Sequence, residues 1–198
     1  MPFAWIASFC TILRRFQRNR DGDAAVQFML IAPLFFALLF AVIETAIMFF
    51  ASQVLETVAQ ESARAIMTGQ AQNGSATVCG GAPCTAATFK SYVCSQIPAI
   101  LSCNNLSVDV ENYLSFSNIT ITSPIDANGN LNSSNFGYNP GGSSSCTGNV
   151  SCSNSIVKVS LYYPWQLFVT GLGYNISSMA GNQRLLTAIA VFRNEPYN

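Results

Sequence analysis

The sequence predicts an α+β protein in which one long N-terminal α-helix crosses a membrane and packs on a small, disulfide-stapled antiparallel β-sheet domain. Three observations predict this fold: an uncharged apolar run at residues 24–43, helical periodicity after it, and a remainder that combines short β-branched segments with six cysteines. Half of the 198 residues are hydrophobic and only 9% are charged. This composition favours a membrane or exported chain.

The composition also excludes several functional classes. The chain has no histidine, so it lacks the central residue of Ser-His-Asp and Cys-His pairs and the imidazole ligand of most zinc enzymes. Nine basic and nine acidic side chains give no net charge, whereas a nucleic-acid binder carries a basic patch. We therefore expect no catalytic residue, no metal, no cofactor and no nucleic acid. A carboxylate pair for glycoside chemistry is a weaker alternative to ordinary surface acids at Asp109, Glu111, Asp126 and Glu195.

The apolar run at residues 24–43 predicts a single transmembrane helix. Its twenty residues span roughly 30 Å at about 1.5 Å per residue, which matches the hydrocarbon core of a bilayer. The positive-inside rule places residues 1–22 in the cytoplasm as a basic leader, because four arginines precede the run: Arg14, Arg15, Arg18 and Arg20. A cleavable secretory signal fits less well, since its apolar region is shorter, about 7–15 residues.

The helix is predicted to continue outside the membrane. Residues 51–68 place apolar side chains at helical spacing, and Gly69 suits the C-cap position. Residues 23–69 thus form one helical unit, of which residues 24–68 would extend about 68 Å. Its Ala-rich stripe favours packing with the helices of other subunits.

Two residues in the apolar segment have alternative interpretations. Pro33 is either a tolerated membrane kink or a bend for helix packing. Glu44 lies either in the outer headgroup region, where an ionisable group costs little, or against a neighbouring subunit in a helical assembly.

Residues 70–198 form the predicted extracytoplasmic domain. Residues 70–83 and 125–155 are expected to be loop or hairpin, with turns at Asn128-Gly129 and Pro140-Gly141. The segment 185–192 is apolar enough to be a central strand. Three segments rich in β-branched and apolar residues predict strands: 106–122, 155–163 and 185–192.

The cysteines of this domain predict disulfides. Six of them in an exported, loop-rich domain allow up to three bridges and fifteen connectivities: Cys79, Cys84, Cys94, Cys103, Cys146 and Cys152. The local pair Cys146–Cys152 is the best single pairing. Metal ligation is a weaker alternative, because the sequence has no CxxC pair and no histidine. Free buried thiols are the other alternative to disulfides.

A series of motifs runs through residues 20–65. In order they are Gly22, a short run of small residues from Asp23 to Val26, Gln27-Phe28, Ala32-Pro33, Glu44 and Ala63-Arg64-Ala65. This combination resembles the TadE-like family of the tight-adherence (Tad) pilus system, and residues 185–195 are similar to the family's closing pattern. The N-terminal resemblance covers about a quarter of the chain.

The resemblance implies a pilin-like fold and a role as a minor pilin or pseudopilin. A prepilin peptidase would cut between Gly22 and Asp23, leaving Gln27 as the fifth mature residue. Type IV pilins usually carry Glu at that position, where it pairs with a neighbouring N-terminus; Gln27 keeps the hydrogen bonding without the charge. Two alternatives follow: a processed subunit that enters the fibre, or an unprocessed assembly factor in the membrane. Assembly and helix packing are expected to involve Gln27, Phe28, Pro33 and Glu44.

The predicted function is therefore structural and not enzymatic. By resemblance, the chain contributes to pilus assembly, adherence and biofilm formation, with other pilin subunits and the Tad assembly machinery as partners. It would lie in the bacterial cytoplasmic membrane, with its C-terminal domain outside or in a surface pilus. The alternative is a permanently anchored binding module, in which Tyr162, Tyr163, Trp165 and Phe168 form a platform, although such aromatic groups are more often core. An ectoenzyme is a third, weaker hypothesis.

Overall fold

The computed structural model describes residues 22–141, 155–169 and 175–195. The helices are α2 (Asp23–Met67), α3 (Ala76–Cys79) and α4 (Ala86–Gln96), with short 3-10 turns at Cys103–Asn105 and Phe116–Asn118. The strands are β1 (Ser107–Tyr113), β2 (Ile156–Gln166) and β3 (Gln183–Arg193). The chain divides into two compact units, residues 1–43 and 44–198. Helix α2 contributes to both.

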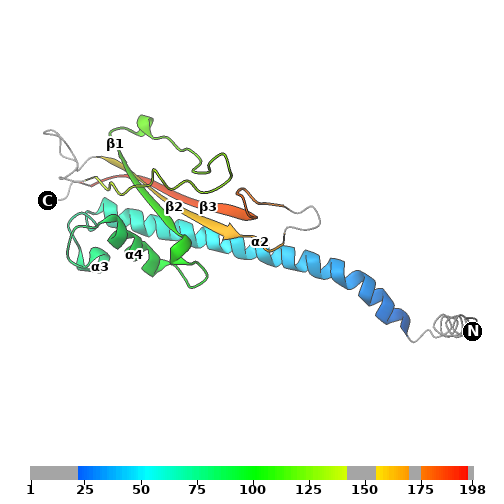
Figure 1. The fold of residues 1–198 in the computed structure, drawn as a ribbon. Helices are drawn as coiled ribbons and strands as arrows, with labels where there is room; N and C mark the ends of the chain where they lie inside the picture. Colours follow the sequence, from blue (N-terminus) through cyan, green and yellow to red (C-terminus); the bar gives the residue numbers. More distant parts are fainter. Residues whose placement is uncertain (1–21, 142–154, 170–174, 196–198) are drawn as a thin grey trace, which may run out of the picture. The chain divides into compact units, whose positions relative to one another are not determined.

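The predicted α+β fold is confirmed. Helix α2 has 45 residues and is, among the described residues, the one helix long and apolar enough to cross a membrane. In the second unit, the sheet lies against the C-terminal half of α2, with α3 and α4 beside it (Figure 1). Apolar side chains of α2, α4 and all three strands form one buried core.

The three strands form an antiparallel sheet in the order β1-β2-β3. The prediction that residues 185–192 form a central strand is wrong: β3 lies at an edge and β2 is central. The reason is visible in the burial of β2, where eight consecutive residues from Ile156 to Tyr163 are buried. In β3, buried and accessible residues are mixed, as an edge position allows.

The predicted strand over residues 106–122 is also shorter than expected. Strand β1 ends at Tyr113, which pairs with Ile156, the first residue of β2. Beyond that point β2 provides no partner, and Ser115 accepts the N–H of Ser117 at the start of a 3-10 turn. Leu114 is consequently 87% exposed.

Helix α4 lies in a segment for which the sequence predicts no helix or strand. It begins with a capping box, in which Thr85 and Thr88 each accept the other's backbone N–H. Its buried residues, Phe89 and Val93, are one helical turn apart and have no exposed area. Residues 76–79, predicted as loop, form the single turn α3.

Four of the six cysteines predicted to form disulfides are paired in two bridges. Cys79 is bonded to Cys84, with Cα atoms 5.3 Å apart, and Cys94 to Cys103, with Cα atoms 5.5 Å apart. The second bridge joins α4 to the turn that precedes β1. The favoured pair, Cys146–Cys152, lies outside the described residues.

Candidate functional site

The first unit exposes the apolar part of α2. Most large apolar side chains between Val26 and Ile43 are exposed, and the most apolar 18-residue window of the helix is only 6% buried. Burying a side chain of this size contributes about 1.5–3 kcal/mol relative to leaving it exposed. An exposed apolar surface of this extent therefore favours an apolar environment, either lipid or other helices.

The residues expected to guide processing and assembly lie along this segment. Gly22 is exposed and directly precedes Asp23, the first residue of α2. Gln27 donates from Nε2 to Oδ2 of Asp23 at 3.1 Å, one turn earlier in the helix. Phe28 is 67% exposed, and Pro33 is an exposed residue inside the helix. The structure therefore brings Asp23 and Gln27 together.

The second half of α2 carries a buried stripe that begins at Glu44. Its members recur every three or four residues and so occupy one face of the helix: Glu44, Met48, Ala51, Leu55, Val58, Ser62 and Ile66. Ala51, Leu55 and Ile66 have no exposed area, and Glu44 is 8% exposed. Glu44 is buried in the domain because it lies on the same face of the helix as these core residues.

The carboxyl group of Glu44 binds the segment that follows β2. The N–H of Phe168 donates to Oε1 at 2.5 Å, and the N–H of Val169 donates to Oε2 at 2.8 Å. Two successive N–H groups that converge on one anionic group form a nest-like arrangement. Hydrogen bonds to a charged acceptor each contribute about 1.5–3 kcal/mol. The contact therefore fixes the β2–β3 connection to one turn of α2.

The end of β2 makes these two N–H groups available. Leu167 donates to the carbonyl of Asn182 at 3.0 Å, and its side chain is 4% exposed. Asn182 has a φ of 56°, so the backbone turns there, just before β3 begins at Gln183. The chain after Leu167 has left the sheet, and Glu44 supplies the acceptors. The side chain of Phe168 is 83% exposed.

A polar cluster lies on β1 and β2. Glu111 and Lys158 are opposite each other in register and form an ion pair. Tyr113 donates its O–H to Oε2 of Glu111 at 2.7 Å. Burial raises the pKa of Glu111, but hydrogen bonds from Lys158 and Tyr113 and the charge of Lys158 outweigh it, so this pKa lies below its ordinary value. Burial lowers the pKa of Lys158, and its interactions with Glu111 and Tyr113 outweigh burial, so this pKa is raised.

The prediction that Asp109 is an ordinary surface acid is wrong. This residue is 4% exposed, and its Oδ1 accepts the N–H of Gly137 at 2.9 Å. Burial raises the pKa of Asp109 by more than this hydrogen bond lowers it. Asp109, Glu111 and Lys158 contribute to the lining of a pocket of about 150 Å³. The contact with Gly137 gives Asp109 a structural role, because it adds to the two backbone hydrogen bonds by which Val110 holds Gly137 and Asn139 beside β1.

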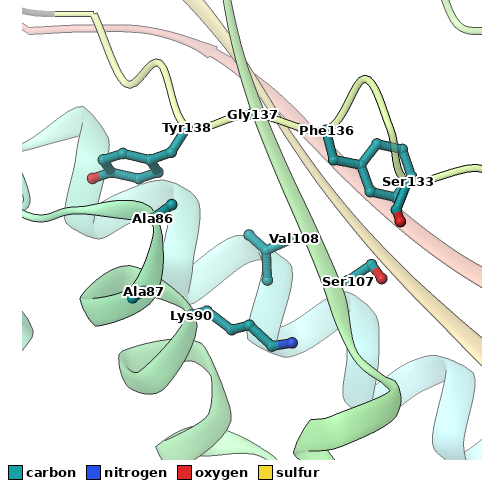
Figure 2. A pocket seen from close by; sticks show the side chains of 9 residues that line it. All are labelled: Ala86, Ala87, Lys90, Ser107, Val108, Ser133, Phe136, Gly137 and Tyr138. Atoms are coloured by element: carbon teal, nitrogen blue, oxygen red, sulfur yellow. The ribbon is translucent and has the colours of Figure 1, made fainter.

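A second pocket, of about 310 Å³, lies between α4, β1 and residues 133–138 (Figure 2). Lys90 extends from α4 beside Val108 of β1 and is the one charged side chain of this lining.

Within the described ranges, no group of three His, Cys, Asp or Glu residues could hold a metal ion.

The aromatic group at the end of β2 divides into core and surface. Tyr162 is buried and stacks on Phe136, with ring centroids 5.0 Å apart. Tyr163 is buried, and its hydroxyl accepts the N–H of Ser102 at 3.1 Å. Phe168 is the exposed member. Two of these residues are therefore core, as such groups usually are.

Sequence reasoning missed the contact between Glu44 and the β2–β3 connection. The two predicted environments of Glu44, the headgroup region and a neighbouring subunit, do not include a partner within the chain. A signal for it was present, because the buried spacing of Leu55, Val58 and Ile66 extends backwards in steps of three and four to Glu44. The sequence gives no indication of which residues bind Glu44, because the donors are backbone N–H groups, which nearly every residue has.

The similarity of this chain to known proteins lies in its N-terminal segment. Residues 22–64 match the sequence model of the family described as TadE-like protein. No curated protein and no solved structure was found to be similar to the chain. The match begins at Gly22 and includes the exposed half of α2, Glu44 and most of the buried stripe. The predicted resemblance is confirmed: this chain carries a TadE-like segment over residues 22–64.

Proposed function

We propose that the chain is a structural, non-catalytic minor pilin or pseudopilin of a Tad pilus that contributes to pilus assembly, adherence and biofilm formation. The observation that carries the proposal is the division of one TadE-like helix. Residues 23–43 expose most of their large apolar side chains, whereas residues 44–67 bury one apolar face in a disulfide-bonded domain. A subunit that moves from a membrane into a fibre needs an apolar helix acceptable to lipid and to neighbouring helices, and an outer domain that stays folded.

The start of α2 supports processing. The helix begins at Asp23, immediately after the proposed cut, so a prepilin peptidase acting between Gly22 and Asp23 would leave the helix complete. Gln27 contacts the side chain of Asp23, the residue that would carry the new N-terminus. In this proposal the basic leader is cytoplasmic and the domain is extracytoplasmic. The partners are the peptidase, the Tad machinery and other pilin subunits.

A deletion strain tests this function. Loss of the gene is expected to abolish pili and surface adherence without changing growth, and the wild-type gene is expected to restore both. A Phe36→Asp variant should fail to restore them, because Phe36 is exposed on the apolar segment and a charge there disfavours both lipid and helix packing. Leu114→Asp, on an exposed residue outside α2, is the matched control and should restore both.

Normal piliation in the deletion strain would contradict the proposal. Loss of adherence with pili intact would instead favour a permanently anchored binding module. Electron microscopy and an adherence assay on the same cultures distinguish these results.

A further inference from the structure

We propose that Phe168 is a second membrane contact of the external domain: Glu44 holds its backbone at the level where α2 leaves the lipid, and its exposed ring enters the outer leaflet. The proposal rests on the membrane span of the proposed function, but not on assembly into a fibre. Glu44 is the positioning residue, and lipid is the partner.

The depth of Glu44 follows from the helix. The uncharged apolar run ends at Ile43, and twenty helical residues at about 1.5 Å each fill the roughly 30 Å of the hydrocarbon core. Glu44, the next residue of the same helix, lies where hydrocarbon meets headgroups. The N–H groups of Phe168 and Val169 are 2.5 and 2.8 Å from its carboxyl oxygens. The backbone of Phe168 therefore lies at the same depth.

The chemistry of the connection favours lipid as the partner. The ring of Phe168 is 83% exposed although the preceding residue, Leu167, is 4% exposed. No Asp, Glu, Lys or Arg occurs from residue 159 to residue 183, so the whole β2–β3 connection is without charged side chains. Phe, Trp and Leu side chains are those that enter the boundary between headgroups and acyl chains, and a charged side chain that entered the hydrocarbon would be costly. Phe49 and Phe50, on the turns of α2 beyond Glu44, are also exposed.

The opposite end of the sheet provides a matched control. Leu114 is 87% exposed, comparable to Phe168, but it follows Tyr113, which pairs with the far end of β2 at Ile156. That end of the domain lies by the last turn of α2, because Asn194 bonds Ser155 and the next residue, Glu195, donates to the carbonyl of Met67. The 23 helical steps from Glu44 to Met67 correspond to about 35 Å. Within the external domain, Leu114 therefore lies far from Glu44 and Phe168.

Depth-dependent fluorescence quenching tests the proposal on the full chain in vesicles. Single-tryptophan proteins are made in a Trp5→Phe, Trp165→Phe background by adding Phe168→Trp, Leu114→Trp or Phe35→Trp. The vesicles are phosphatidylcholine with bromine at a shallow or a deep acyl position. Phe35→Trp should lose emission mainly to the deep label and Phe168→Trp mainly to the shallow label. Leu114→Trp should lose none.

The outcomes separate this proposal from the membrane span itself. Quenching of Phe35→Trp without quenching of Phe168→Trp would overturn the membrane contact alone. Absence of quenching at both positions would overturn it together with the span. A blue shift of Phe168→Trp that follows the protein-to-lipid ratio, without bromine quenching, would show that a second copy covers the ring.

Removal of the carboxyl group tests the positioning role. Adding Glu44→Ala should reduce the shallow quenching of Phe168→Trp and leave that of Phe35→Trp unchanged. Glu56→Ala, on an exposed residue of the same helix, is the control and should change neither. Full quenching of Phe168→Trp in the Glu44→Ala protein would show that Glu44 does not hold the ring in place.

Discussion

The N–H of Val169 donates to Oε2 of Glu44 across 125 positions of the sequence. With the neighbouring bond from Phe168, this contact ties the β2–β3 connection to the turn of α2 at which the buried stripe begins. Because Glu44 also follows the last residue of the apolar run, one side chain links the sheet to the end of the uncharged apolar part of the helix.

The first prediction concerns this contact. Glu44→Ala should expose the amides of Phe168 and Val169, because each loses a hydrogen bond to a charged acceptor that contributes about 1.5–3 kcal/mol. Hydrogen exchange of the detergent-solubilised chain should show faster exchange over residues 167–169 and little change in β1. Unchanged protection at Phe168 and Val169 would contradict the contact.

The second prediction distinguishes the two halves of α2. Leu55→Ala should lower the free energy of unfolding of the external domain by about 2–5 kcal/mol, as expected for a fully buried leucine. Leu38→Ala, on a residue that is 59% exposed, should change it by less than about 0.5 kcal/mol. Urea unfolding of both variants in the same detergent measures the difference. Equal losses would contradict the division of the helix.

The third prediction concerns the disulfides. Peptic peptides of the unreduced protein should include one that links Cys79 to Cys84 and one that links Cys94 to Cys103. Replacing Cys94 and Cys103 together by serine should destabilise the domain by up to about 3 kcal/mol, because a short closed loop constrains the unfolded chain by that amount. A peptide that links Cys84 to Cys94 would contradict this pairing.

The fourth prediction concerns the ion pair of Glu111 and Lys158. Its contribution should be present above the ordinary pKa of Glu111, 4.5, and be lost as pH falls through the lower pKa of the folded state. It should also be present below the ordinary pKa of Lys158, 10.5, and be lost as pH rises through the raised folded value. Glu111→Gln should therefore lower the free energy of unfolding near pH 7. The loss should be limited to about 1–2 kcal/mol, because the Glu111 side chain is 39% exposed and solvent screens the pair.

Unfolding of wild type and Glu111→Gln from pH 3 to pH 8 tests this dependence. The two stability curves should converge below the folded pKa of Glu111 and separate above pH 4.5. Glu56→Gln serves as the control on an exposed acid. A difference between wild type and Glu111→Gln that does not change over this range would show that charge is not the cause.

The parts of the fold that could be predicted are those with long, regular patterns. The helix that ends at Met67 and the strands from Ile156 and Gln183 were recognised because their apolar residues recur over many positions. Helix α4 lacks such a pattern, since only Phe89 and Val93 of its residues are buried. The order of the strands depends on pairing across the sheet, which no single strand encodes, and this is why β3 was mistaken for the central strand.

The candidate site was predictable to a similar degree. Asp23, Gln27, Phe28, Pro33 and Glu44 were recognised from motif positions within the TadE-like segment. The burial of Asp109 was not predicted, because it depends on a loop that returns to β1 only in the folded chain. The partner of Glu44 was missed for the same reason.

The most direct test of the central claim is N-terminal sequencing of the protein in filaments sheared from its own host, together with the membrane fraction of the same cells. The proposed function predicts protein in the sheared filaments with Asp23 as its first residue. Protein found only in the membrane fraction, with its N-terminus intact at Met1, would contradict a processed pilus subunit and favour a permanently anchored module.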